Sequence, residues 1–132
     1  MNVFKSATLL AAVMAPAGLA SAQGLHAVHP LAGYTCAQVN LSAEQLRDFS
    51  ALPPIFQSPS ANAPRTGTAG ATVIVVSPPR IVNGLQQILQ LDGQLGWTAA
   101  DKLKPWSNPM FPHGACIPSQ MSNGHPGFAY RR

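Results

Sequence analysis

Residues 70–106 read GATVIVVSPPRIVNGLQQILQLDGQLGWTAADKLKPW, and this stretch decides the fold class of the chain. Its first apolar run, Thr72–Val76, is β-branched almost throughout and ends before two prolines, which is typical of a strand. Asp92-Gly93 lies between two further apolar runs, and this dipeptide predicts a hairpin with a type I′ turn. The run over residues 85–91 fits either a strand or one face of a helix, and the hairpin signal favours the strand. The stretch therefore predicts a mainly β fold of short antiparallel strands.

The N-terminal residues 1–22 have the layout of a secretory signal peptide. Lys5 precedes an apolar run over residues 9–14, and Ala20-Ser21-Ala22 supplies a small-residue cleavage site before Gln23. An uncleaved membrane anchor is the alternative, but the run is too short to cross about 30 Å of hydrocarbon. We therefore expect a periplasmic or secreted protein with no membrane span in the mature chain. The remaining stretch of about 110 residues is the size of one small domain.

The chain contains two cysteines, Cys36 and Cys116. An even count in an exported chain predicts one disulfide, which would close a loop around most of the mature protein. Two unpaired thiols are the alternative. A small domain of this size often needs such a covalent link, because its apolar core is limited.

The charge of the chain is mildly basic, with eight Lys and Arg against four Asp and Glu. These cations are scattered along the sequence, and the largest group is the terminal pair Arg131-Arg132. Nucleic-acid binders carry a basic cluster with interleaved aromatic residues. We therefore expect no nucleic-acid partner.

The segments on either side of the central stretch carry weaker signals. In the N-terminal extension, residues 23–54, Ser42 and Gln45 have the spacing of a capping box and predict a short helix over residues 43–50. The C-terminal residues 107–132 contain repeated Pro and Gly and little periodicity. We expect this segment to be an irregular wrap around the core.

Within residues 55–106, the Asp92-Gly93 hairpin is followed by Gly96-Trp97-Thr98-Ala99-Ala100-Asp101-Lys102-Leu103. This order of features resembles a bacterial SH3-like (SH3b) domain. The resemblance implies a small SH3-like antiparallel β-barrel, partly open and five-stranded, that binds peptides, cell-wall material or partner proteins without catalysis. Ala99 and Lys102 stand where eukaryotic peptide-binding SH3 domains carry the Pro and Tyr of the ligand groove. Polyproline recognition is therefore not expected.

One motif suggests an enzyme. Pro112-His113-Gly114-Ala115-Cys116-Ile117 loosely resembles the Ser-His-Gly-Cys-Ile-Arg motif of L,D-transpeptidases, in which a thiolate beside a histidine is the nucleophile. Here Ala115 is inserted before the cysteine, and Pro118 replaces the arginine of the family. A disulfide at Cys116 would also remove the thiolate. We expect no catalytic residue, and a cysteine transpeptidase-like enzyme using Cys116 remains a remote alternative.

Four aromatic residues are candidates for contact with a ligand or partner: Trp97, Trp106, Phe128 and Tyr130. Trp97 lies on the second strand of the predicted hairpin, Trp106 follows Lys104-Pro105, and Phe128 and Tyr130 alternate along a possible edge strand. Packing in the core or under the C-terminal segment is the alternative for each of them. The four histidines are scattered, so no metal site and no cofactor is expected.

Together these features predict a non-catalytic, exported, SH3-like module that binds a protein or a cell-wall component. The alternative is a small structural or accessory subunit of a periplasmic complex, in which the same surface only fills an interface.

Overall fold

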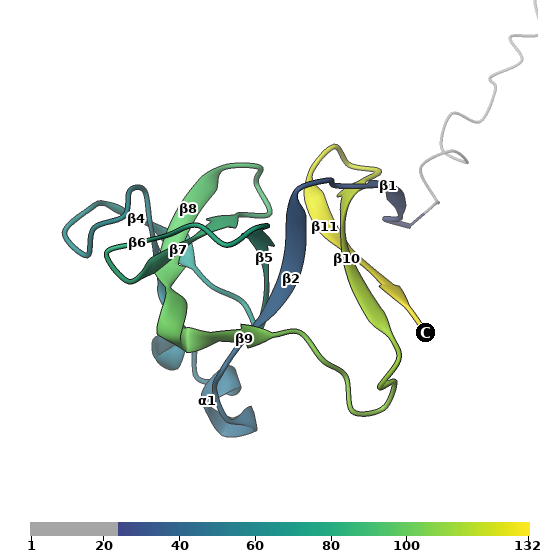
Figure 1. The fold of residues 1–132 in the computed structure, drawn as a ribbon, viewed down its shortest axis with the longest axis horizontal. Coiled ribbons are helices and arrows are strands. Elements are labelled where there is room, and N and C mark those ends of the chain that lie inside the picture. Colours follow the sequence, from purple (N-terminus) through teal and green to yellow (C-terminus); the bar gives the residue numbers. More distant parts are fainter. Residues whose placement is uncertain (1–23) are drawn as a thin grey trace, which may run out of the picture.

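A computed structural model describes residues 24–132 of the chain, so the predicted signal peptide at residues 1–22 lies outside the described residues. Figure 1 shows a larger and a smaller β-sheet lying side by side. The strands of the larger sheet are β2 (Tyr34–Val39), β3 (Pro54–Phe56), β4 (Arg65–Thr68), β5 (Thr72–Val76), β6 (Ile81–Val82), β7 (Leu85–Leu89), β8 (Leu95–Ala99) and β9 (Leu103–Pro105). The strands of the smaller sheet are β1 (Ala27–Pro30), β10 (Ala115–Met121) and β11 (Pro126–Arg131). All the pairings are antiparallel, so the mainly β expectation is confirmed.

The central hairpin predicted from the sequence is present as β7 and β8. Five residue pairs join the two strands, from Leu85↔Ala99 to Leu89↔Leu95. Strand β5, the β-branched run, lies on the other side of β7, where Ile74 pairs with Leu89. The ambiguous run over residues 85–91 is thus a strand over Leu85–Leu89, because pairing on both of its edges stabilises an extended backbone more than an isolated short helix.

The turn type predicted for Asp92-Gly93 is wrong. Gly93 has φ +89°, and its N–H donates to the carbonyl of Gln90 at 2.9 Å. The N–H of Gln90 donates in turn to the carbonyl of Gln94 at 2.8 Å, so the loop has three residues and one left-handed glycine. The two-residue turn with positive φ at both positions is instead Asn83-Gly84, at +52° and +76°, between β6 and β7. Both turns still join antiparallel neighbours.

The larger sheet does not close into a barrel, and with eight strands it also differs from the partly open, five-stranded barrel that the SH3-like resemblance implies. The strand order of the larger sheet is β4-β3-β8-β7-β5-β2-β9, with β6 beside β7, and its end strands β4 and β9 do not pair with each other among the described residues. These end strands have four and three residues, and β3 meets β8 through the single pair Phe56↔Trp97. Such short ladders at both ends of the sheet leave it open.

The larger sheet is buried on both of its faces. Val73 and Val75 point to one face, where they join a core cluster with Ala37, Val39, Ile55, Ala69 and Ile88. Ile74 between them points to the other face, because side chains alternate along a strand. Ile74 is fully buried, and the smaller sheet lies on its side, with Phe128 of β11 lining the same groove as Ile74. The smaller sheet therefore covers part of the outer face of the larger one.

The C-terminal segment is not the irregular wrap that was expected. Residues 107–114 are a loop, but β10 and β11 form a hairpin of six residue pairs, from Ala115↔Arg131 to Gln120↔Pro126. The prolines that suggested irregular chain, Pro118 and Pro126, lie within these strands. Their positions in the ladder, described below, explain why the strands tolerate them.

The N-terminal extension contributes both strands and helix. Its strand β2 pairs with β5 and β9, so it belongs to the same sheet as the strands of residues 55–106. The helix α1 spans Ala43–Arg47, and a capping box formed by Ser42 and Gln45 precedes it. Leu46 packs against the core cluster, which anchors an otherwise short helix.

A 3₁₀ turn, Phe49–Ala51, follows α1. Asp48 caps this turn, and it accepts hydrogen bonds from the hydroxyl of Ser50 at 2.7 Å and from the Ser50 N–H at 3.0 Å. These two bonds hold the pKa of Asp48 below its ordinary value of 3.8, the hydroxyl bond contributing more. The cap lies far from the aromatic candidates in the sequence.

Candidate functional site

The disulfide predicted from the cysteine count is present and joins the two sheets. The sulfurs of Cys36 on β2 and Cys116 on β10 are 2.06 Å apart, and their Cα atoms are 6.0 Å apart. Cys36 lies directly opposite Ile74, and Cys116 directly opposite Tyr130. Residues that are directly opposite in an antiparallel pair share a face of their sheet. The bridge therefore also fixes which faces of the two sheets meet.

Three of the four aromatic candidates lie together. The ring centroids of Trp106 and Tyr130 are 5.9 Å apart, and those of Phe128 and Tyr130 are 6.4 Å apart, with the latter two rings stacked. Trp106 and Phe128 are half-buried, whereas Tyr130 is 63% exposed. We call these three residues the aromatic cluster. The cluster therefore has two half-buried rings that are held in place by packing and one ring that is accessible to solvent, an arrangement that suits a contact surface.

Trp97 lies apart from the aromatic cluster. It is 6% exposed on β8, between Phe56 of β3 and Gln87 of β7. The guanidinium of Arg80 covers its ring at 5.5 Å from the ring centroid. The structure thus places Trp97 in the packed part of the larger sheet, which is the alternative that the sequence left open for this residue.

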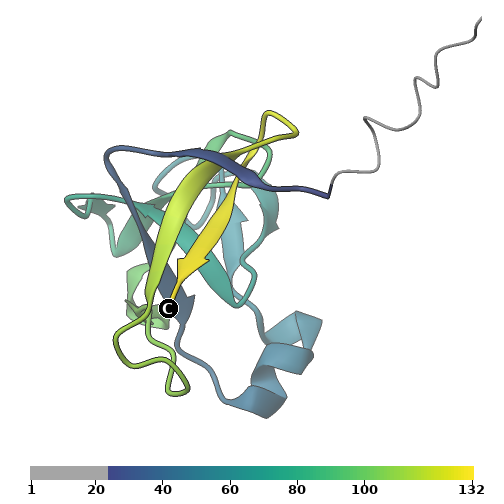
Figure 2. The same cartoon turned by 90° about the vertical axis from the view of Figure 1, so that its right-hand side faces the viewer.

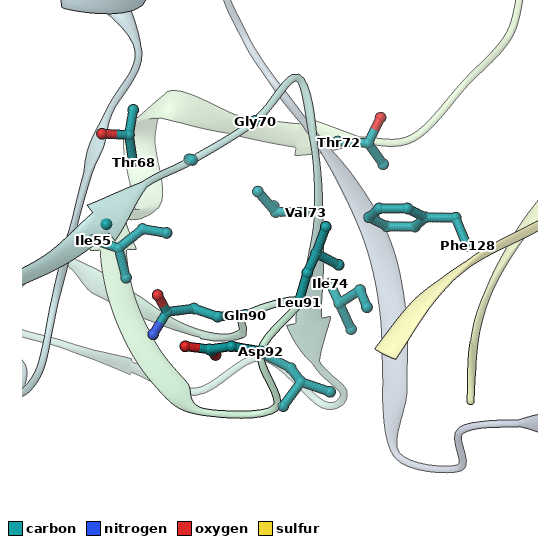
Figure 3. Close-up of a pocket in the computed structure, with 13 residues that line it drawn as sticks. Ile55, Thr68, Gly70, Thr72, Val73, Ile74, Gln90, Leu91, Asp92 and Phe128 are labelled. Carbon is teal, nitrogen blue, oxygen red and sulfur yellow. The ribbon is translucent and has the colours of Figure 1, made fainter. Parts of the chain in front are cut away.

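An apolar groove lies between one member of the aromatic cluster, Phe128, and the larger sheet. It has a volume of about 260 Å³ and is lined by the start of β5, the β7–β8 turn, the loop after β4, and Phe128 (Figure 3). Figure 3 shows the Phe128 ring directed toward Thr72 and Ile74 across the gap between the two sheets. Leu91 at the rim is 55% exposed, so the groove offers apolar surface to solvent.

The sequence contains no signal that marks Ile74 and Leu91 as part of a site. Each lies in a pattern that a strand or a turn already explains, and Ile74 is one of several similar residues in its run. Ile74 and Leu91 join the site only through their positions in the folded structure, because Phe128 on β11 is far along the chain from β5 and from the β7–β8 turn. A larger cavity of about 500 Å³ lies beside α1 and β9, but no aromatic residue lines it.

The transpeptidase-like motif does not form a nucleophilic site in this structure. The sulfur of Cys116 is bonded to Cys36, so attack by its thiolate would first require reduction of the bridge. Residues 24–132 contain no group of three or more His, Cys, Asp or Glu side chains arranged to hold a metal ion. No helix within the same residues is long and apolar enough to span a membrane.

Comparison of the chain with protein-family models, with curated proteins and with solved structures finds no match. The case for a function therefore depends on the aromatic cluster, the groove beside it and the bridge between the sheets.

Proposed function

We propose that this chain is a non-catalytic, exported, SH3-like module that binds a protein or a cell-wall component. The observation that supports the proposal best is the gathering of Trp106, Phe128 and Tyr130 in one cluster, whose member Phe128 also lines an apolar groove. Aromatic side chains that combine a buried base with an exposed edge are over-represented at binding hot spots, because they bury a large area at low cost in side-chain entropy.

Two further observations support parts of this proposal. Strand β8, which contains Gly96-Trp97, passes through a 3₁₀ turn at Ala100–Lys102 into β9, the order of elements that suggests an SH3-like origin. The Cys36–Cys116 bridge fits export, because disulfides persist in oxidising compartments such as the periplasm or the extracellular space.

An accessory subunit of a periplasmic complex is the second candidate. Several large apolar side chains outside the groove are strongly exposed, among them Met110 at 81% and Phe49 at 71%. Burial of such side chains in a permanent assembly would stabilise it. A partner that co-purifies at fixed stoichiometry and depends on Met110 or Phe49 would favour this candidate.

The test uses the exported protein with its disulfide intact. Binding to purified cell-wall sacculi is measured by co-sedimentation, and a protein partner is sought by crosslinking in the periplasmic fraction. We expect Tyr130→Ala to weaken the interaction by about 30-fold, the effect of removing a hot-spot aromatic worth about 2 kcal/mol.

Phe49→Ala is the matched control, because Phe49 is an aromatic residue on another element and is at least as exposed as Tyr130. It should leave binding unchanged. Equal binding by the wild type and Tyr130→Ala, or no binding to sacculi and no crosslinked partner, would exclude the aromatic cluster as a binding surface.

A further inference from the structure

Strand β11 has an open edge. It is the end strand of the smaller sheet, whose order is β1-β10-β11, and its only strand partner among the described residues is β10. Figure 2 shows β11 in yellow with β10 along one side and no strand of its sheet along the other. A free strand edge carries a row of unpaired N–H and C=O groups and is a template for a further strand.

The hydrogen-bond phase of the hairpin shows which residues present these groups. The N–H of Met121 donates to the carbonyl of His125 at 2.9 Å, so this is a hydrogen-bonded pair. Hydrogen-bonded and non-hydrogen-bonded pairs alternate along an antiparallel ladder. Cys116↔Tyr130 and Pro118↔Phe128 are therefore non-hydrogen-bonded pairs, and the main-chain groups of Phe128 and Tyr130 point away from β10.

Two independent features agree with this phase. The carbonyl of Pro118 accepts a hydrogen bond from the N–H of Leu31 at 2.8 Å, on the side of β10 opposite to β11. Both prolines of the hairpin, Pro118 and Pro126, occupy non-hydrogen-bonded pairs, so neither removes a bond between β10 and β11. The two residues with outward main-chain groups thus both belong to the aromatic cluster, and one of them, Phe128, also lines the groove.

An added strand would lie next to this groove. Its side chains on the face shared with Phe128 and Tyr130 would point toward the larger sheet, where the exposed Leu91 at the groove rim offers apolar contact. At the end of β11, Arg131 and Arg132 are exposed, and Arg132 lies over the ring of Phe111 at 4.9 Å from its centroid. These charges favour an acidic group on the occupant.

We propose that the open edge of β11 binds an extended peptide segment by strand addition, with apolar side chains at alternate positions and an acidic residue beside Arg131-Arg132. This inference deepens the proposed binding function and depends on it. A second copy of the chain fits the edge less well, because β11 and its turn contain no acidic residue and would add only further arginines. Main-chain hydrogen bonds supply affinity in this mode, and alternate side chains supply specificity.

The test uses a capped heptapeptide, Asp-Asp-Val-Thr-Val-Thr-Val, and amide hydrogen exchange of the disulfide-bonded protein. In the free protein, the amides of Phe128 and Tyr130 should exchange fast, and that of Ala129 slowly, because only Ala129 donates to β10. Saturating peptide should slow exchange at Phe128 and Tyr130 at least 10-fold and leave Ala129 unchanged. A peptide with Lys in place of Asp should bind about 3-fold more weakly at low salt.

Tyr130→Pro provides a sharp variant, because it removes an outward N–H that the hairpin itself does not use. It should abolish peptide-induced protection at Phe128, whereas Tyr130→Ala, which keeps the N–H, should retain part of it. The slow amide of Ala129 reports in each variant that the hairpin is still folded.

Two results would overturn the inference. Binding to sacculi or to a protein partner without protection at Phe128 and Tyr130 would leave the proposed function intact and exclude strand addition. Protection that appears without peptide as the protein concentration rises would assign the edge to a second copy. If the peptide protects Phe128 and Tyr130 but the protein binds neither sacculi nor any partner, strand addition at the β11 edge is supported and the proposed function is contradicted.

Discussion

At the scale of single residues, the surroundings of Gly96 show why β8 requires a glycine directly before Trp97. A Cβ atom on Gly96 would lie 2.6 Å from Cγ2 of Ile55, 3.0 Å from the side-chain nitrogen of Gln90 and 3.4 Å from the carbonyl of Phe56. Ile55 is itself a buried member of the core cluster. The Ile55 side chain of β3 can therefore pack over β8 at this point only because Gly96 has no side chain.

We predict that Gly96→Ala destabilises the protein by about 1–3 kcal/mol, the usual cost of overpacking a filled core. Urea denaturation of the disulfide-bonded protein measures this as a lower midpoint with an unchanged slope. Gly24→Ala is the control, because a Cβ there meets nothing within 4 Å. An unchanged midpoint for Gly96→Ala would show that β3 and β8 do not meet in this way.

At the scale of elements, the β7–β8 and β10–β11 hairpins use one turn design. Gly93 and Gly124 have φ of +89° and +84°, and each N–H donates to the carbonyl three residues earlier. The side chains of Asp92 and Asn123 accept from the N–H two residues ahead, at 2.9 Å and 3.0 Å. Both loops thus place an Asp or Asn before a left-handed glycine, which fixes the register of the strands.

We predict that Gly93→Ala costs about 1–2 kcal/mol, because an L-residue with a Cβ is strained at this φ. Gly93→Asn should cost less, because Asn tolerates the left-handed region better. Thermal unfolding of the two variants gives the comparison. Gly70→Ala is the control, since its nearest neighbour would be at an ordinary 3.8 Å. Equal losses for Ala and Asn would argue that the turn does not require positive φ.

At the scale of the whole molecule, the Cys36–Cys116 bridge joins the larger sheet to the hairpin that carries the aromatic cluster. The two cysteines are 80 residues apart in the sequence. In the chain-entropy model, a loop of about this length stabilises the folded state by about 4–5 kcal/mol, because it restricts the unfolded chain. This is a large part of the stability of a small domain.

We predict that the Cys36→Ser, Cys116→Ser double variant loses about 4–5 kcal/mol of unfolding free energy. Its denaturation slope should also rise, because the unlinked chain exposes more surface when unfolded. The mass of the wild type with and without reductant verifies that the bridge is formed. An equal midpoint for the two proteins would show that the sheets are held by packing alone.

Part of the candidate site could be predicted from the sequence, and a comparison of individual residues shows which part and why. Phe128 and Tyr130 can be predicted because they alternate in the sequence, and alternation is a property of a single strand. The sequence does not separate Trp97 from them, although Trp97 packs between β3 and β7, because it does not show which face of a sheet is covered. The groove wall at Ile74 and Leu91 had no signal, because its partner Phe128 comes from a distant strand.

The β class, the strand at Thr72–Val76, the strands around Asp92-Gly93 and the pairing of the two cysteines could all be predicted from the sequence alone. These follow from side-chain branching, alternation and turn chemistry, which act over a few neighbouring residues. Three outcomes required the folded structure: the larger sheet stays open, residues 115–131 join β1 in a second sheet, and Trp106, Phe128 and Tyr130 form one cluster with Phe128 next to the groove that Ile74 lines. Those outcomes depend on which sheet faces cover one another, and that choice is made by contacts between residues that no local pattern connects.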